Sequence, residues 1–516
     1  MPGAIASIRN SRRPLFAVVY WVLAALAAYE VAEFILSGDL ASFIYLGMFI
    51  AAAVGVVTVL NDWRKGVYLF LAWILFEDLF RKYLGNNMAI YFAKDGLALL
   101  LYLSFFRAQR MNRFERFRPV FLVPLLCFFL FGTIQVFNPS STSLFYGLLG
   151  MKLYFLYVPL LYIGYQLIDS ERRLRRFFVY NLVLILVVVC LGIAQSILGH
   201  TFLNPGIMQE DIRELGTLYR AAPISGLVSY RPTSVFVSTG RFQNFLILSW
   251  ILTLGFGGFL LLRSRQGRHF AFTCIGVVAA GSIMCTSRGV VVWNVGSTLI
   301  IMAGFLWGAS WRNRERHRVL RTIQRIAIFV GAAIIFLIVV FPEQLSSRLA
   351  LYSETLNPTG PASELVYRSR DYPLKNLLAA LEYQNWPYGY GIGTASLGVQ
   401  YVARIMHAVP MGIGVENGYG LLILELGLVG LILWIVLVTA ITVSAWRAAK
   451  SLRGSPWFPI AFVIFWYVFM LAVPMSYASF GSYQDFVLNA YFWLLLGVLL
   501  RLQVLARTPE FIESEK

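Results

Sequence analysis

Two carboxylates stand at the start of one apolar segment, VENGYGLLILELGLVGL (415–431). Glu416 precedes the apolar run, and Glu425 lies about 13 Å deeper if the segment is a helix that rises ~1.5 Å per residue. A partly desolvated carboxylate can accept the proton of a hydroxyl group, so Glu416 is a candidate general base. The helix dipole, which favours an acid at this position, is the alternative explanation. His407 is a second candidate base, and we interpret Glu425 as a structural acid that needs Arg, Lys or helix backbone as its partner.

Arginines that could bind an anion recur around this segment. Arg288 lies in CTSRGVVVW (285–293), between two apolar runs with almost no loop, where an arginine is costly and therefore a functional candidate. The alternative is an arginine that reaches up to the lipid headgroups. The guanidinium fork matches phosphate oxygens two at a time, so an anionic ligand is predicted. Four further arginines are candidates for binding the anionic ligand. Arg231 and Arg241 flank RPTSVFVSTGR. For Arg368 and Arg370, the alternative is a place on a solvated loop face.

The composition decides the fold class. The chain is 59% hydrophobic and only 13% charged, with a mean hydropathy of +0.70, and many apolar runs reach the ~20 residues that span a bilayer as a helix. We predict an all-α polytopic membrane protein with about 14 transmembrane helices. They are expected near 15–36, 41–60, 67–80, 88–106, 119–137, 144–167, 177–199, 242–262, 270–286, 290–308, 325–341, 417–445, 457–478 and 487–503.

The net charge of +18 is explained by topology. Most of the 43 lysines and arginines fall on alternate loops, which marks the cytoplasmic side and places both termini there. Nucleic acid is therefore not an expected partner. The predicted organisation is N-terminal helices (1–106), core helices (107–341) with an outer loop (200–241), a long outer loop (342–416) and C-terminal helices (417–516). The candidate arginines are expected on the outer face. The positive-inside rule should keep that face poor in arginine and lysine.

The long outer loop contains two patterned stretches. In DYPLKNLLAALEYQNWP (371–387), Leu374, Leu377, Leu378 and Leu381 recur at helical spacing. They predict an amphipathic helix that either rests on the membrane surface or packs onto the spans. In WPYGYGIGT (386–394), alternating glycines allow tight turns and close approach to a ligand. No strand–turn–helix context supports a nucleotide site, and the histidines and cysteines have no metal-ligand spacing, so neither a cofactor nor a metal is expected.

Several of these motifs together resemble the bacterial O-antigen ligase and polymerase family. They are TSRG at a hairpin tip, PYGYGIG in the long loop, ENGY leading into LELGLVGL, and RPTSVFVSTGRFQNF before the preceding span, across about residues 225–435. The resemblance implies a GT-C-like fold and an undecaprenyl-diphosphate-linked glycan as donor at the periplasmic face of the inner membrane. It also implies inverting, metal-independent transfer to an acceptor hydroxyl, with arginines on the diphosphate. Many ligases have a histidine where this chain has Glu416, immediately before Asn417.

The resemblance thus predicts a glycan polymerase or ligase, with Glu416 and Arg288 as catalytic residues and with Asn417 and Tyr419 added to the substrate-binding set. The acceptor can be a lipid-linked glycan, a lipid A core or a protein, and a chain-length regulator is a possible partner. The alternatives are a flippase or exporter of lipid-linked oligosaccharides and a non-catalytic scaffold. Charge inside the spans is expected to be sparse, which favours the enzyme over the exporter.

Overall fold

The computed structural model describes residues 40–84, 88–112, 117–205, 217–263, 267–308, 339–357, 363–407 and 413–506, with the single positions 324, 331, 335 and 360. These residues form two compact units. One comprises residues up to Leu71 and the segment Gly96–Phe114, and the other comprises Ala72–Asp95 and Glu115 onwards. Both are mostly helical, as predicted, and the described chain adds one unpredicted two-stranded sheet.

The smaller unit contains α3 (Leu40–Asn61), the start of α4 (Trp63–Tyr83) and the end of α5 (Met88–Asn112). Its helices are joined by a hydrogen bond from Ser104 Oγ to Val59 O at 2.6 Å and by an edge-to-face contact between Trp63 and Phe105, whose ring centroids lie 5.1 Å apart. A hydroxyl group that bonds a carbonyl of the next helix is a common way to join helices where lipid replaces water.

The larger unit is a helical bundle built around α22 (Phe486–Leu505), which is buried on every face from Phe486 to Leu499. A helix that is apolar all round is expected at the centre of a membrane bundle. Its neighbours approach closely at glycines: a Cβ atom on Gly164 would lie 2.1 Å from Leu494 O. The surrounding helices are α6 (Leu122–Gln135), α7 (Leu144–Phe155), α8 (Leu160–Leu167), α9 (Glu171–Leu198), α11 (Thr239–Arg263), α12 (Arg268–Met284), α13 (Arg288–Gly308), α18 (Gly418–Ser451) and α19 (Phe458–Met470).

Eight segments among the described residues are long and apolar enough to cross a membrane. They support a multi-pass membrane protein and are fewer than the predicted set. Predicted span 15–36 and most of 325–341 lie outside the described residues. The helices α6 and α12 are apolar but shorter than a full span. The helix α4, at predicted span 67–80, is not among the eight segments. The total of about 14 therefore stays a prediction.

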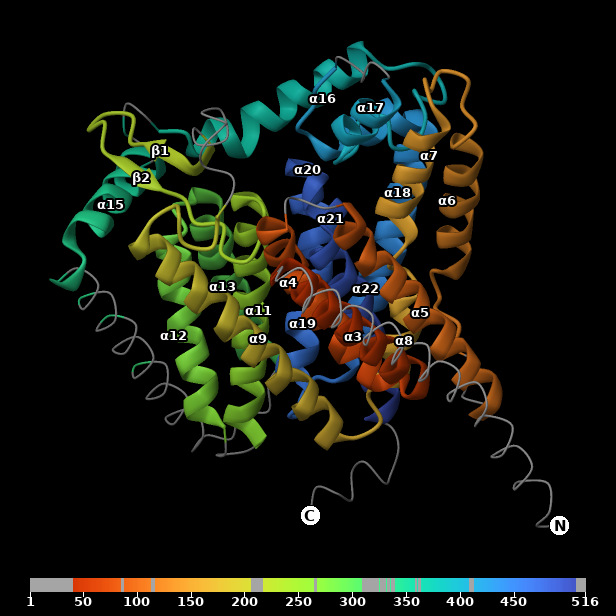
Figure 1. The fold of residues 1–516 in the computed structure, drawn as a ribbon, viewed down its shortest axis with the longest axis horizontal. Coiled ribbons are helices and arrows are strands. Elements are labelled where there is room, and N and C mark those ends of the chain that lie inside the picture. The colour runs from red at the N-terminus through yellow and green to blue at the C-terminus, as the bar shows by residue number, and fades with distance from the viewer. Residues whose placement is uncertain are drawn as a thin grey trace. The chain divides into compact units, whose positions relative to one another are not determined.

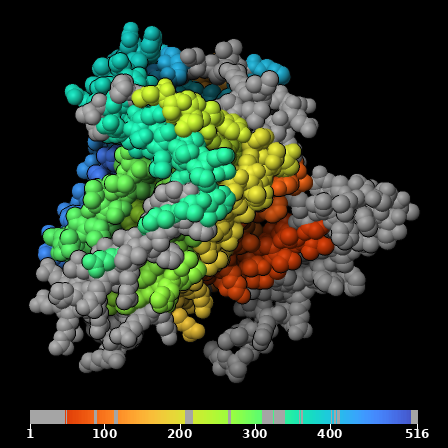
Figure 2. Space-filling model, turned by 90° about the vertical axis from the view of Figure 1, so that its left-hand side faces the viewer, coloured from red at the N-terminus to blue at the C-terminus, as the bar shows by residue number. Residues whose placement is uncertain are grey.

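The two predicted outer loops meet at one end of the larger unit, which we call the loop end (Figure 1). They supply β1 (Tyr219–Ala221), β2 (Val228–Tyr230), α15 (Pro342–Leu356), the π-helical turn η1 (Tyr367–Asp371), α16 (Tyr372–Glu382) and α17 (Val399–Met406). The turn between the strands is held by Glu354 of α15, whose carboxylate accepts from the backbone N–H groups of Ile224 and Ser225 at 2.7 and 3.1 Å. Figure 2 shows the yellow surface of this hairpin beside the turquoise surface of α15.

The amphipathic helix lies where it was predicted, as α16, and it shows the second of the two predicted arrangements, packing onto the spans. It packs onto α18 through Ala380, whose Cβ would lie 2.9 Å from a Cβ on Gly420. Leu374 and Leu378 of the leucine stripe remain 44% and 56% exposed. Packing therefore uses the face beside the stripe and leaves the leucines free to meet lipid.

The alternating glycines contact the protein's own helices. Gly389, Gly391 and Gly393 all have positive φ angles, of 73°, 104° and 88°. The N–H of Gly391 donates to Glu425 O at 2.9 Å, and a Cβ on Gly393 would lie 1.9 Å from Tyr146 O. The close approach that the glycines allow is thus to helices α7 and α18 and not to the predicted ligand, and it fixes the loop to the bundle.

Gly393→Ala should destabilise the bundle. The alanine would add a clash with Tyr146 O to the strain of its φ of 88°, which alone costs about 1–3 kcal/mol. The matched control is Gly398→Ala, because Gly398 has a similar φ of 91° and a Cβ there would meet only side-chain atoms of Leu149 at 3.9 Å. We expect the melting temperature in detergent to fall further for Gly393→Ala than for Gly398→Ala. Equal losses would mean that the close approach is unimportant.

Candidate functional site

Arg288 lies at the loop end because α12 and α13 are joined by a very short turn. The helix α12 ends at Met284, and α13 begins at Arg288 itself. Thr286 within the turn has a φ of 57°, which reverses the chain within a few residues. The Arg288 side chain is 11% exposed, and its Nη1 lies 2.8 Å from Glu364 Oε1. The arginine is therefore held by a carboxylate of the long loop.

Glu364 connects Arg288 to the rest of the predicted site. Its Oε2 lies 3.5 Å from Nε of Arg368, and Nη1 of Arg368 lies 3.7 Å from Oε2 of Glu416. We call Arg288, Glu364, Arg368 and Glu416 the loop-end ion cluster. The two predicted catalytic residues are thus joined by a continuous chain of charged contacts.

Two further arginines add positive charge around the cluster. Burial, together with the charges of Arg288 and Arg231, lowers the pKa of Arg220 to about 10. Burial and the charge of Arg288 also lower the pKa of Arg231. The hydrogen-bonding contact with Arg288 holds the pKa of Glu364 below its usual value. Guanidinium groups that repel one another at a half-buried position favour an anion between them.

The turn that carries Arg288 is positioned by Arg348 of α15, which is only 2% exposed. Nε of Arg348 donates to Met284 O and Thr286 Oγ1, each at 3.1 Å. Its Nη2 donates to Ser196 Oγ at 2.6 Å and to Tyr230 O at 3.3 Å. One guanidinium therefore ties the turn to α9, β2 and α15. The sequence identified Arg348 only as one of several outer cations, because these partners are far apart in the chain.

Arg348→Met should destabilise the loop end, because the substitution leaves buried carbonyl and hydroxyl groups without their donor. Hydrogen bonds from a charged group contribute about 1.5–3 kcal/mol, and we expect a loss of that order in the free energy of unfolding. Thermal unfolding in detergent measures it. Arg370→Met is the control, since Arg370 is exposed and forms no ion pair with the described residues. Identical melting of the two variants would contradict a positioning role for Arg348.

Asn417 has a structural role in place of the predicted contact to substrate. Its Oδ1 accepts from the N–H of Gly420 at 2.8 Å and thereby caps α18, while its Nδ2 donates to Pro373 O at 3.1 Å. It is fully buried. The adjacent Glu416 is 66% exposed at its side chain, and its N–H donates to Asn376 Oδ1 at 3.1 Å. The cap therefore leaves Glu416 at the solvent-facing mouth of α18, as predicted.

Three other predicted residues lie apart from these contacts. Tyr419 packs its ring edge-to-face on Tyr477, with centroids 5.5 Å apart. Arg370, on the same π-helical turn as Arg368, is exposed. His407 ends α17 with a φ of 49° and is exposed, and no hydrogen bond or ion pair among the described residues joins it to the loop-end ion cluster. Of the two candidate bases, only Glu416 belongs to the cluster.

Glu425 is structural, as predicted, but its partners differ from an arginine or lysine. The carboxylate is fully buried and accepts from Tyr154 Oη at 2.8 Å, from Ser396 Oγ at 2.7 Å and from the N–H of Ala395 at 2.9 Å. These donors belong to α7 and to the segment after the glycine run. Glu425 therefore anchors that segment to α18.

The helices that could span the membrane contain more paired charge than the sequence analysis expected, since Lys94, Asp95 and Lys152 lie within such helices. Within the larger unit, an inner ion network connects α4, the start of α5, α7 and α11. Arg241 Nη1 lies 2.6 Å from Asp78 Oδ2, so this predicted phosphate ligand is a structural member of the network. Lys152 pairs with Asp95 at 2.6 Å. The network comprises Glu77, Asp78, Arg81, Lys94, Asp95, Lys152 and Arg241.

Comparisons with known proteins leave the family open, because neither a protein-family model nor a curated protein matches the chain. The likeness of its motifs to O-antigen ligases and polymerases therefore stays an expectation. What the chain does is argued below from the loop-end ion cluster and from the chemistry that its side chains can perform.

Proposed function

We propose that the protein is a membrane glycosyltransferase that transfers a glycan from a lipid diphosphate to an acceptor hydroxyl group at the loop end. The observation that carries the proposal is the continuous chain of contacts from Arg288 through Glu364 and Arg368 to Glu416. With Arg220 and Arg231 beside this chain, four arginines face two glutamates, so the loop end combines an excess of positive charge with an accessible carboxylate. Expulsion of a diphosphate and activation of a hydroxyl require these two features.

In the proposed reaction, the acceptor oxygen attacks the anomeric carbon, and the bond from that carbon to the phosphate oxygen breaks. The lipid diphosphate leaves with the bonding electrons, and the hydroxyl proton passes to Glu416. Arg288, assisted by Arg220 and Arg231, stabilises the charge that develops on the leaving oxygen. Glu364 is a positioning residue, because it holds Arg288 and Arg368 at a fixed separation. Direct displacement inverts the anomeric configuration and needs no metal ion.

The family resemblance extends this proposal to the substrates. The donor is then an undecaprenyl-diphosphate-linked oligosaccharide, and the active face is the periplasmic face of a bacterial inner membrane. The product is an O-antigen or exopolysaccharide, so the protein is a polymerase or a ligase according to its acceptor. A chain-length regulator would be a partner of the polymerase.

The inner ion network favours a second candidate function, export or flipping of a lipid-linked oligosaccharide. Ionisable residues within spans often line a path for ions or substrates. Here, however, Lys94 pairs with Glu77 at 2.9 Å, and both side chains are fully buried. Oppositely charged side chains that neutralise one another in this way also join helices, so the pair does not by itself indicate a transport path. The exporter is therefore the alternative that an experiment must exclude.

Purified protein in detergent separates the two functions, because detergent removes the membrane partition that an exporter needs. The protein would be incubated with an undecaprenyl-diphosphate oligosaccharide and an acceptor glycan, and released undecaprenyl diphosphate would be measured. Release that depends on the acceptor supports the transferase. If no release occurs and vesicles that contain the protein translocate the same lipid, the exporter replaces it.

A further inference from the structure

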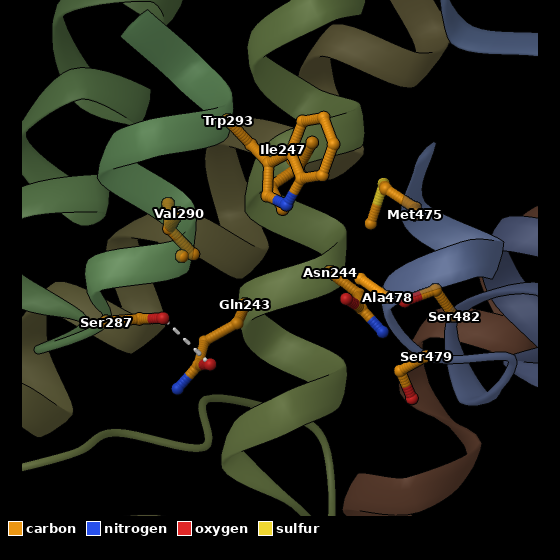
Figure 3. A pocket seen from close by; sticks show the side chains of 11 residues that line it. Gln243, Asn244, Ile247, Ser287, Val290, Trp293, Met475, Ala478, Ser479 and Ser482 are labelled. Atoms are coloured by element: carbon orange, nitrogen blue, oxygen red, sulfur yellow. Dashed lines mark hydrogen bonds between the residues drawn. The ribbon is translucent and has the colours of Figure 1, made fainter. Parts of the chain in front are cut away.

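A cavity of about 190 Å³ opens directly beside Arg288. Ser287 and Gly289, the two residues that flank Arg288, both line it. Figure 3 shows its walls: the start of α13 on one side, the first turns of α11 behind, and α20 (Ser476–Ala478) with α21 (Gly481–Gln484) on the other side. The cavity therefore adjoins the turn that carries Arg288.

The polar lining of the cavity is neutral. It consists of the two side-chain amides of Gln243 and Asn244 and the hydroxyl groups of Ser287, Ser479 and Ser482, with no charged side chain among the lining residues. Gln243 Oε1 accepts from Ser287 Oγ at 2.9 Å (Figure 3). Gln243 Nε2 is shielded from solvent and has no hydrogen-bond partner among the described residues. A shielded amide N–H that lacks an acceptor is costly, so a ligand oxygen that accepts from it would be favoured.

Apolar groups form the inner part of the cavity. Trp293, Ile247 and Met475 lie around it at the end away from Ser287 and Ser479 (Figure 3). The cavity volume corresponds to about six water molecules at ~30 Å³ each, which is room for one small ring and not for an oligosaccharide. Neutral amides and hydroxyls beside an aromatic ring match a sugar ring, which presents hydroxyl groups at its edge and C–H groups on its faces.

Other ligands fit the lining less well. A phosphate group would favour charged donors such as the neighbouring arginines, and none lines this cavity. A polyprenyl chain would place hydrocarbon against the amide of Asn244, Gln243 Nε2 and the hydroxyls of Ser479 and Ser482, which is unfavourable. The chemistry of the walls thus favours a neutral, hydroxyl-rich group.

We infer that this cavity binds one neutral monosaccharide unit, the sugar attached to the diphosphate that the arginines hold. The inference rests on the proposed function, since Arg288 must bind the diphosphate for the adjoining cavity to receive its sugar. Gln243 and Asn244 recognise the hydroxyl groups, and Trp293 covers one face of the ring. The cavity therefore selects the first sugar of the donor.

Binding of sugar-bearing and sugar-free probes tests the inference. Full-length protein in detergent would be titrated with a short polyprenyl diphosphate, either bare or carrying glucose, galactose or N-acetylglucosamine. We expect at least one sugar-bearing probe to bind about tenfold more tightly than the bare probe, as polar recognition of hydroxyl groups allows. Gln243→Met should abolish this difference and leave the affinity for the bare probe unchanged. Asn244→Leu is the second variant, should Gln243→Met fail to fold.

Ser249→Ala is the control, because Ser249 lies further along α11, is buried and has an unpartnered Oγ. The subsite is disproved if wild-type protein binds every sugar-bearing probe no more tightly than the bare one. It is also disproved if Gln243→Met and Asn244→Leu retain the preference for the sugar or weaken all probes equally. Arg288→Ala should weaken every probe. If wild-type protein binds none of the probes, or if Arg288→Ala weakens none, the proposed function fails.

Discussion

Arg288→Ala is expected to reduce glycan transfer about 10²–10³-fold, the loss typical of removing one donor that stabilises charge in a transition state. The reason is the position of the guanidinium, which is nearly buried, lies at the start of α13 and is fixed by Glu364 at 2.8 Å. Alanine would remove this positive charge from the start of α13 and leave Arg220 and Arg231 as the other cations around the turn. The measurement is the rate of undecaprenyl diphosphate release, together with the affinity for the bare polyprenyl diphosphate.

Two comparisons make the effect of Arg288→Ala specific. Arg288→Lys retains the charge and loses the fork, so its activity should lie between wild type and alanine. Arg176→Ala is the neutral control, because Arg176 is exposed and lies about 30 Å along α9 from Ser196, at ~1.5 Å per residue. Normal transfer by correctly folded Arg288→Ala protein would show that Arg288 is not part of the site and would contradict the proposed function.

The sequence predicts the elements of this protein better than the roles of its charged residues. The apolar runs and the leucine spacing predict the helices, because both depend on local patterns of side chains. The alternating glycines predicted close approach to a ligand, whereas Gly393 closely approaches the protein's own backbone. The partner is Tyr146 O on a helix about 250 residues earlier in the chain, and no local pattern contains that information.

Arg241 and Arg348 illustrate why charged residues were harder to interpret. Both are arginines beside apolar runs, as Arg288 is, yet Arg241 pairs with Asp78 of α4, and Arg348 bonds carbonyl and hydroxyl groups of three elements. Whether a charge is exposed to a substrate or satisfied internally depends on these distant partners. Glu364 could have been found, because it lies four residues before Arg368, the spacing at which opposite charges meet on a helix.

Asn417 shows how one residue type at one position fits two different roles. An asparagine that precedes an apolar run is a strong capping signal, and the structure uses it in that way. The resemblance assigned the same residue to substrate binding because it belongs to the ENGY motif. Because Asn417 is completely buried, the structure favours its capping role over substrate binding. The cap also fixes the position of Glu416 at the start of α18.

Glu416→Gln is expected to reduce transfer about 10²–10⁴-fold, the usual contribution of a general base, while the affinity for the donor remains unchanged. The two carboxylates of the loop-end ion cluster differ in how readily each can accept a proton from the acceptor hydroxyl. Glu364 is held between two arginines, and its lowered pKa makes it a weak base. Among the described residues Glu416 forms one ion pair, with Arg368 at 3.7 Å, and it also lies beside the Tyr372 hydroxyl; its side chain is 66% exposed, so an acceptor hydroxyl can reach it.

The expected pattern across four variants separates a base from a positioning residue. Glu416→Gln should lower the rate of transfer and leave donor affinity intact, because Arg288, Arg220 and Arg231 are untouched. Glu364→Gln should weaken donor affinity as well, since Arg288 loses its anchor. Glu382→Gln, at an exposed glutamate at the end of α16, is the matched control for charge and size.

His407→Ala should retain activity. Loss of transfer in His407→Ala, with normal transfer in Glu416→Gln, would make His407 the base and would require α17 to approach the cluster during the reaction.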